Sequence, residues 1–316
     1  MLKSMGFYRG VNLGGWLSQC DYSEERLNNF IKEEDIAKIA SWGLDHVRIP
    51  LDYNVVEEED GTYKEDGFNR IATALEWCRK YNLNAILDLH KTMGYSFDPN
   101  HKEAGFFDSE QLQERFYALW IQLAKRFGND PEHVAFELLN EVTAKEFIDE
   151  WNRISYECIK RVREYAPNTL ILVGSYYNNS ASAVKDLADP YDDKVIFNFH
   201  CYDPLEFTHQ GAHWVTVFDQ SRRLTYEECK ITPQFFDDFF ASAIAKAKEC
   251  NTTLYCGEYG VIDIVSPEET LKWYKDINSI FEKYGISRSA WSYKEMDFGL
   301  SDPRMDSVRE ELLKYL

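Results

Sequence analysis

The sequence contains no long hydrophobic run. A helix that crosses a bilayer needs about 20 consecutive apolar residues, and no stretch of the chain reaches that length. Residues 1–6 lead directly into a strand-like pattern and lack the apolar core of a signal peptide. We therefore expect no membrane partner, and either a cytoplasmic protein or an extracellular one from which a leader has been removed.

Positive charge is also scarce. The 316 residues include 35 lysines and arginines but 54 aspartates and glutamates, which gives a formal net charge of −19. A surface of this sign repels nucleic acids and anionic membranes, so neither is expected as a partner. A neutral substrate is compatible with it, and we expect a monomer.

Cysteine motifs are lacking as well. The sequence has seven cysteines and no CxxC pair, and the odd number does not suit a complete disulfide framework. They are Cys20, Cys78, Cys158, Cys201, Cys229, Cys250 and Cys256. Several fall within apolar strand or helix patterns, which favours buried free thiols over zinc ligands.

What the sequence does contain is a regular alternation of strand-like and helix-like segments. Short apolar runs predict eight strands, at residues 7–13, 44–49, 84–89, 134–139, 170–173, 195–199, 253–256 and 288–291. Their nearly continuous hydrophobicity is typical of parallel strands covered by helices. Between them, Phe68, Ile71, Leu75 and Cys78 mark one face of an amphipathic helix. Eight such units in series predict an α/β fold, a (β/α)8 TIM barrel, with residues 1–316 as a single catalytic domain.

Two segments between the predicted elements are long. Residues 91–108 follow the third predicted strand, and residues 203–233 follow the sixth. In such a barrel these segments lie on the face that carries active sites. The candidate contacts of a cleft are Trp16, Phe106, Phe107, Trp214 and Lys294. We favour Trp214, because it lies in a long loop rather than in an apolar stripe.

Polar or aromatic side chains stand at the ends of six predicted strands. They are Arg48, His90, Asn140 with Glu141, His200 with Tyr202, Glu258, and Trp291. The C-terminal ends of parallel strands meet on one face of a barrel, so these side chains are expected to converge. Each alone has an ordinary structural explanation, such as a helix cap or a core histidine, but the joint pattern indicates a site.

Two glutamates in this set suggest a reaction. Glu141 and Glu258 follow the fourth and seventh predicted strands, on opposite sides of the barrel mouth. Two carboxyl groups about 5–5.5 Å apart break glycosidic bonds with retention of configuration, one as nucleophile and the other as proton donor. The nucleophile must stay ionised, and Arg48 and Tyr202 are the available neighbours. The sequence therefore predicts a glycosidase.

At these positions the chain resembles glycoside hydrolase family 5, the cellulase family of barrel glycosidases. The resemblance extends over nearly the whole chain and rests on Arg9–Trp16, Arg48–Pro50, Leu87–His90, Asn140–Glu141, His200 with Tyr202, Gly257–Glu258, and Trp291. It implies that Glu141 is the general acid/base and Glu258 the nucleophile, and that no metal or organic cofactor takes part. The supporting residues that it implies are Arg48 and Tyr202 around Glu258, Asn140, His90 and His200 around the −1 sugar, and Trp291 stacked on that sugar.

The resemblance has one visible departure and one ambiguity. Many relatives have proline after the acid/base, where this chain has Val142; the change affects the entry to the next helix but not the carboxylate. The segment 14–16 is similar to exo-β-1,3-glucanases of the family, whereas residues 207–214 look like bacterial endo-β-1,4-glucanases. We favour a retaining endo-β-1,4-glucanase that acts on cellulose-type or mixed-linkage β-glucan.

Three alternatives stay open. The same fold and mechanism can serve another β-glycan, namely β-1,3-glucan, xyloglucan or mannan. A metal-dependent barrel hydrolase or lyase would use Asp88, His90, Glu141 and Glu258 as ligands, although the scarcity of neighbouring histidines speaks against it. A barrel that binds carbohydrate without cleaving it is the third.

Overall fold

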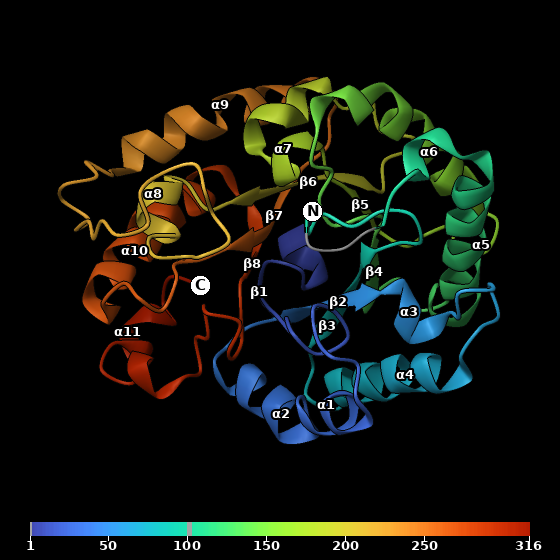
Figure 1. Cartoon of the computed structure of the whole chain (residues 1–316), viewed down its shortest axis with the longest axis horizontal. Coiled ribbons are helices and arrows are strands. Elements are labelled where there is room, and N and C mark those ends of the chain that lie inside the picture. Colours follow the sequence, from blue (N-terminus) through green and yellow to red (C-terminus); the bar gives the residue numbers. More distant parts are fainter. Residues whose placement is uncertain (1, 100–102) are drawn as a thin grey trace.

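The computed structural model describes residues 2–99 and 103–316. Within them, eight parallel strands close into a barrel in the order β1-β2-β3-β4-β5-β6-β7-β8, with helices around it (Figure 1). The strands are β1 (Arg9–Asn12), β2 (His46–Asp52), β3 (Asn84–Lys91), β4 (Val134–Glu137), β5 (Ile171–Val173), β6 (Val195–Cys201), β7 (Leu254–Tyr259) and β8 (Ser287–Ala290). The predicted (β/α)8 barrel is confirmed. Residues 100–102 of the long segment predicted after the third strand lie outside the described residues.

Each predicted strand range overlaps one strand of the barrel, and the differences lie at the strand ends. β3 continues to Lys91 and β7 to Tyr259, so His90 and Glu258 lie inside strands rather than after them. β4 ends earlier than predicted, at Glu137. The chain stays bonded to the sheet beyond that point, since the Asn140 N–H donates to the Leu89 carbonyl at 3.1 Å.

The helices follow the predicted amphipathic pattern. They are α1 (Glu24–Asn29), α2 (Glu33–Ser41), α3 (Tyr53–Val56), α4 (Glu65–Lys80), α5 (Glu110–Phe127), α6 (Ile148–Val162), α7 (Tyr176–Asn179), α8 (Leu205–Thr208), α9 (Pro233–Glu249), α10 (Pro267–Tyr284) and α11 (Arg309–Leu312). Short 3-10 helices are η1 (Leu2–Met5), η2 (Phe106–Asp108), η3 (Lys145–Phe147), η4 (Ala181–Asp186) and η5 (Pro303–Met305). In α4 the residues Phe68, Ile71, Leu75 and Cys78 are all buried, as the sequence predicts.

The inside of the barrel is apolar at the end where the strands begin. Leu2 and Phe7 pack there in one buried cluster with Ile86, Leu172 and Ile196. The short helix η1 therefore closes this end, and in Figure 1 the N-terminus lies near the middle of the ring of helices. The opposite end is left for a site.

Farther along the strands the barrel interior becomes polar. The side chains of Asn12, Arg48, Asp88, Glu137 and Asn198 are fully buried at this level. Strand side chains alternate between two faces, and the register pairs Asn12 with Arg48 and Asp88 with Glu137 on neighbouring strands. We call these five residues the polar layer; it supports the mouth of the barrel.

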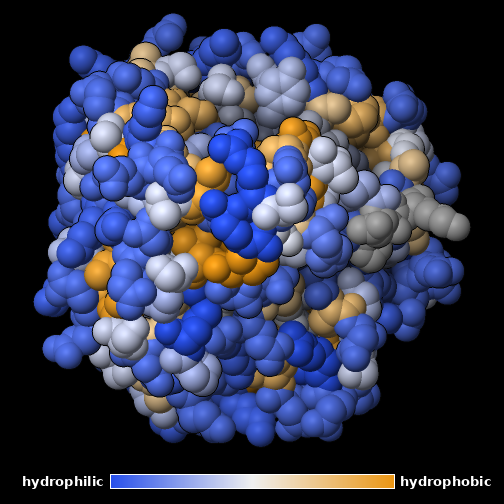
Figure 2. All heavy atoms as spheres, turned by 60° about the vertical axis from the view of Figure 1, so that its left-hand side comes forward, coloured by the Kyte–Doolittle hydropathy of each residue, from blue (hydrophilic) through white to orange (hydrophobic). Residues whose placement is uncertain are grey.

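The outer surface agrees with the acidic composition. In Figure 2, hydrophilic residues cover most of the face on the side of α8 and α10, and hydrophobic residues gather in a hollow near its centre. All seven cysteines are free thiols; Cys20, Cys229 and Cys250 are only half-buried, so the expected burial is wrong for these three. No helix in the described part of the chain is long and apolar enough to cross a membrane.

Candidate active site

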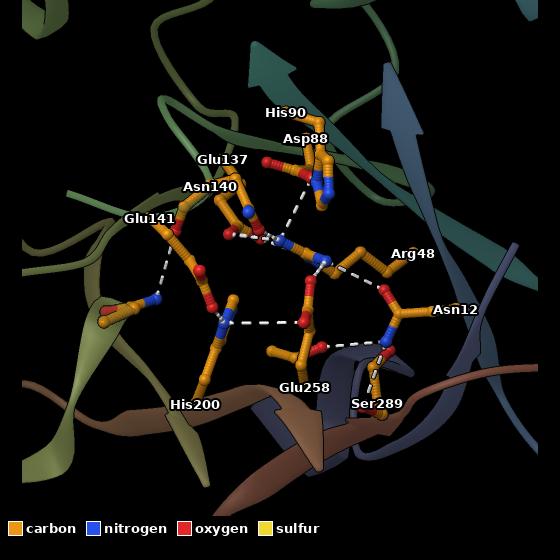
Figure 3. A network of polar contacts seen from close by, with 12 residues as sticks. Asn12, Arg48, Asp88, His90, Glu137, Asn140, Glu141, His200, Glu258 and Ser289 are labelled. Carbon is orange, nitrogen blue, oxygen red and sulfur yellow. Dashed lines mark hydrogen bonds and ion pairs between the residues drawn. The ribbon is translucent and has the colours of Figure 1, made fainter. Parts of the chain in front are cut away.

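Arg48 is the centre of a buried network at the mouth of the barrel (Figure 3). Its Nε and Nη2 donate to the two carboxylate oxygens of Glu137, each at 2.7 Å. Its Nη1 donates to Glu258 Oε1 at 2.7 Å, and Nη2 also lies 3.0 Å from Asp88 Oδ2. One guanidinium therefore contacts three buried carboxylates from three different strands.

The charges of this network explain why Arg48 stays protonated. Burial opposes the charge of a guanidinium, but the carboxylates of Asp88, Glu137 and Glu258 outweigh it and hold the pKa of Arg48 well above its ordinary value. Removing one member of such a buried group leaves an uncompensated charge, which costs several kcal/mol. The geometry is therefore strongly interdependent.

Glu258 is surrounded by groups that favour its ionised form. Tyr202 donates its hydroxyl to Glu258 Oε2 at 2.9 Å. Burial opposes ionisation, but His200, Arg48 and His90 together with the Tyr202 hydroxyl hold the pKa of Glu258 at about 2. Burial and the nearby Glu258 raise the pKa of Tyr202, so this hydroxyl keeps its proton. A carboxylate held in this way is suited to act as a nucleophile.

The backbone before Glu258 is fixed by the polar layer. The Gly257 N–H donates to Asn198 Oδ1 at 3.0 Å, and the Gly257 carbonyl accepts from Asn12 Nδ2 at 2.9 Å. A Cβ atom at Gly257 would lie 2.8 Å from Asn198 Oδ1 and 3.0 Å from His200 Nε2. Only glycine fits here, because the strand passes directly against the polar side chains.

Glu141 has a different environment. Its Oε1 lies 2.8 Å from His200 Nδ1, and its Oε2 accepts from Asn178 Nδ2 at 2.8 Å. The backbone carbonyl of Glu141 accepts from the Tyr95 hydroxyl at 2.8 Å. Among the described residues, no ion pair joins Glu141 to a lysine or an arginine. It therefore lacks the strong cationic support that Glu258 has.

Two buried polar atoms beside the glutamates form no hydrogen bond with the described residues. They are Nδ2 of Asn140 and Nε2 of His200. Arg48 Nη2 donates to Asn140 Oδ1 at 2.8 Å, so the orientation of this amide is set and its Nδ2 remains available. Buried polar atoms without a partner are uncommon. Nδ2 of Asn140 suits a hydroxyl of a sugar, whereas Nε2 of His200 lies against Gly257.

His90 and Trp291 lie together beside the network. Their rings stack, with centroids 5.8 Å apart and an interplanar angle of 5°. His90 Nδ1 lies 2.6 Å from Asp88 Oδ2. Burial opposes protonation of His90, but Asp88 and Glu258 outweigh it and raise the pKa of His90. The structure thus brings together all the residues predicted at strand ends.

Trp214 lies outside this network, on the long segment after β6. Its side chain is half exposed, and its ring centroid lies 6.4 Å from that of His209. The His209 ring contacts Tyr202 at 4.9 Å, edge to face. A continuous line of rings therefore runs from Glu258 through Tyr202 to the exposed Trp214.

Three other aromatic candidates are wrong as cleft contacts. Trp16 is buried, and its indole N–H donates to the Leu27 carbonyl at 2.9 Å. Phe106 and Phe107 are buried and pack against each other, with ring centroids 5.1 Å apart. These rings belong to the core because the loops fold back on the helices. Lys294 is engaged too, since its Nζ lies 3.1 Å from Asp35 Oδ2.

A grouping that could bind a metal differs from the predicted one. Within the described residues, Glu141, His200 and Glu258 each offer one ligand atom, and these atoms lie within 4.8 Å of one another. Asp88 and His90 are not members. Asp88 Oδ2 instead contacts Arg48 and His90.

Sequence reasoning missed Glu137, Asn198, Asn12 and Asn178 as parts of the site. The first two are single polar residues inside apolar strand runs, which is a signal in itself, because a lone charge or amide in a buried strand needs a partner. Asn12 falls at the end of the first predicted strand and could have been found in the same way. Asn178 gave no sequence signal, because it lies in α7, which is a turn with left-handed residues rather than a regular helix.

Comparisons with known proteins agree with this geometry. A family model described as cellulase (glycosyl hydrolase family 5) matches residues 9–297. Cellodextrinase A of Ruminococcus flavefaciens is 56% identical over 288 residues, which covers 91% of this chain and 86% of that protein. Endoglucanase C of Acetivibrio thermocellus is 38% identical, and the match covers 99% of this chain and 98% of that protein.

Solved structures extend the comparison to the fold. Cel5A of Thermotoga maritima, solved in complex with mannotriose, has a TM-score of 0.83 at 26% identity, and the match covers 98% of both chains. The same enzyme has been solved with cellobiose, at a TM-score of 0.83 and 26% identity, and that match covers 97% of both chains. The chain therefore belongs to glycosyl hydrolase family 5, the cellulase family, and is a glycoside hydrolase.

Proposed function

We propose that the protein is a retaining endo-β-1,4-glucanase in which Glu258 is the nucleophile and Glu141 the general acid/base. The observation that carries this proposal is the proximity of the two carboxyl groups, whose ligand atoms lie within 4.8 Å. Retaining enzymes hold their carboxyl groups about 5–5.5 Å apart, whereas inverting enzymes need about 6.5–9.5 Å to admit a water. The unequal environments of the two groups support the division of roles.

In the first step, a carboxylate oxygen of Glu258 attacks the anomeric carbon while the bond to the leaving oxygen breaks. Glu141 gives its proton to that oxygen, so the leaving sugar departs as an alcohol and a covalent glycosyl-enzyme forms. In the second step, Glu141 takes a proton from water, and the resulting hydroxide oxygen displaces Glu258 from the anomeric carbon. The two inversions give net retention.

The surrounding residues have supporting roles in this proposal. Arg48 and Tyr202 keep Glu258 ionised and in place. Asn140, His90 and His200 face the sugar in the −1 position, and Trp291 stacks on it. The exposed Trp214 extends the sugar-binding surface beyond that position. No cofactor is required, and residues 1–316 act as one barrel domain and as a monomer.

The relatives support a β-1,4-glucan as the substrate. The two similar proteins named above are a cellodextrinase and an endoglucanase, which suggests soluble cellodextrins, cellulose or mixed-linkage glucan. Mannan is the second candidate, because the Thermotoga enzyme has been solved with mannotriose. Reducing ends released from carboxymethylcellulose, barley β-glucan, xyloglucan, laminarin and mannan distinguish these. Release from mannan alone would overturn the glucan proposal.

Azide rescue tests the two catalytic roles. A Glu258→Ala variant should lose nearly all activity and regain turnover with azide, giving an α-glycosyl azide. A Glu141→Ala variant should instead give the β-glycosyl azide from an activated aryl cellobioside, because its nucleophile is intact. Wild-type enzyme with azide is the control. Near-normal activity of Glu258→Ala without azide would exclude it as the nucleophile.

A further inference from the structure

We propose that Asn178 is a positioning residue for the acid/base, and that its amide supports the carboxyl group of Glu141 through both proton transfers. This inference rests on the proposed role of Glu141. Asn178 Nδ2 donates to Glu141 Oε2 at 2.8 Å. The contact comes from the turn after β5, a part of the barrel mouth that the strand-end pattern did not include.

The backbone at Asn178 is held in an unusual conformation. Tyr177, Asn178 and Asn179 have φ values of 53°, 53° and 60°, so three successive residues other than glycine are left-handed. Asparagine tolerates this region better than most residues. Strained backbone that persists in a folded protein tends to lie at functional sites, and here it directs an amide at a catalytic carboxyl group.

The turn is bonded directly to the segment after β4 that carries Glu141. The Asn178 N–H donates to the Val142 carbonyl at 3.0 Å, and Asn179 Nδ2 donates to the Asn140 carbonyl at 3.4 Å. The residues on both sides of Glu141 are therefore bonded to the residues that present the amide. The amide and the carboxyl group move together rather than independently.

An amide is suited to a group that changes its protonation state. Its N–H stabilises a carboxylate, and after rotation about the terminal bond its oxygen accepts from a protonated carboxyl group. Asn178 is exposed to solvent. Glu141 must give a proton in the first step and take one in the second, and one amide can serve both states.

Other titratable groups also face Glu141, and the test must take them into account. His200 Nδ1 lies 2.8 Å from Oε1, and Glu258 belongs to the same group of ligand atoms. Tyr202 is close enough for its phenol to interact with Glu141, and Tyr95 donates to the Glu141 backbone. All four are unchanged in Asn178 variants, so a shift of the pH profile in such variants reports the amide.

The experiment measures kcat/KM against pH for an aryl cellobioside in Asn178→Ala, Asn178→Gly and Asn178→Asp. The basic limb reports loss of the proton from the free acid. Without the N–H donor the proton is held more tightly, so the limb should move up by about 0.5–1 pH unit in the alanine and glycine variants. In Asn178→Asp the new side chain places a second carboxylate beside Glu141, and the basic limb should move to a still higher pH.

A second readout separates the two steps. With a very good leaving group the first step needs no acid, and kcat then reports the base role of Glu141. We expect kcat for such a substrate to fall about three- to tenfold in Asn178→Ala. Glycine adopts positive φ freely, so Asn178→Gly should show the same shift of the pH limb with a higher Tm than Asn178→Ala.

The matched control is Asn251, which is also left-handed, with φ 52°, and lies exposed after α9. Asn251→Ala should lower Tm by a similar amount and leave the pH profile unchanged. If the basic limb of the pH profile does not move in either Asn178→Ala or Asn178→Gly, Asn178 only stabilises the turn and does not position Glu141. That result is distinct from failure of the proposed function, which would appear as retained activity in Glu141→Ala.

Discussion

The Nη1 atom of Arg48 lies 2.7 Å from Oε1 of Glu258, and both side chains are buried. Burial opposes the charge of this carboxylate, and the guanidinium is one of the groups, with His200, His90 and Tyr202, that keep it ionised. The other nitrogens of Arg48 bind Glu137 and Asn140, so one side chain sets the position of the nucleophile and the orientation of a sugar-binding amide.

Replacing Arg48 by lysine should therefore be severe. An ammonium group keeps the charge but cannot make the planar, forked contacts of a guanidinium. We expect kcat of Arg48→Lys to fall by about two to three orders of magnitude, a loss comparable to that of one preorganised hydrogen-bond donor in other enzymes. Steady-state kinetics on an aryl cellobioside measure this. Arg115→Lys is the control, because Arg115 lies away from the site and its Nε is 2.7 Å from Oε1 of the buried Glu57. Equal losses of kcat in both variants would contradict the assignment.

Glu137 should contribute to both stability and kcat although it does not face the sugar. It accepts from Nε and Nη2 of Arg48 and, at 2.8 Å, from Asn198 Nδ2. A Glu137→Gln variant presents an N–H to a guanidinium that has only donors. We expect the free energy of unfolding to fall by about 3–5 kcal/mol, as when one partner of a buried ion pair is removed, and kcat to fall with little change in KM.

The control for Glu137→Gln is Glu57→Gln, which removes a buried partner of Arg115 outside the site. Denaturant unfolding and kinetics on the same preparations compare the two. Comparable loss of stability in both variants, with loss of kcat only in Glu137→Gln, is the expected pattern. Unchanged kcat in a folded Glu137→Gln would show that Arg48 needs no such support.

The stability of the enzyme should fall at acid pH because of Glu258. Its pKa is about 2 in the folded protein and about 4.3 in an unfolded chain. The folded state thus gains stability from the ionised group above about pH 4.3, and this gain is lost as the pH falls toward 2. The total is about 3 kcal/mol. Urea unfolding of wild type and Glu258→Gln between pH 3 and 7 should detect about half of this loss, and equal pH dependence in both would refute the assignment.

The sequence was sufficient to predict the barrel and the location of Glu141 and Glu258 at its mouth, because both follow from periodic signals; their catalytic roles stay a prediction. Strand and helix periods repeat along the chain, and residues at strand ends must meet on one face. Glu137 and Asn198 were missed because their strands read as continuous apolar runs. Asn178 was missed for another reason. Its contact with Glu141 depends on three left-handed residues, and no local sequence pattern predicts that conformation.

The aromatic candidates show the same limit of prediction from the sequence. The sequence favours Trp214 for its place in a long loop, but it does not show that Trp16 and Phe106 are buried; packing separates those rings from the exposed one. If Trp214 contacts the glucan chain, Trp214→Ala should raise KM for cellopentaose about tenfold, in line with the loss of one stacked ring contact. The effect on a short aryl cellobioside and on Tm should be small.

The control for Trp214 is Tyr156→Ala, which removes another exposed ring, on α6. It should leave both substrates and Tm nearly unchanged. If Trp214→Ala leaves KM for cellopentaose unaltered, or if Tyr156→Ala raises it equally, the ring at Trp214 has no part in binding the substrate.

Treatment with a chelator should leave activity unchanged. Among residues 2–99 and 103–316, the three groups that could bind a metal are Glu141, His200 and Glu258, and two of them are already engaged by Asn178, Arg48 and Tyr202. A divalent cation at this position would have to displace those donors and would occupy both carboxylates that the double displacement needs free. Added zinc should therefore inhibit, competitively with substrate, whereas a metal-dependent enzyme would lose activity with the chelator and regain it with zinc or manganese. Initial rates with and without EDTA, followed by titration with each ion, distinguish the two mechanisms.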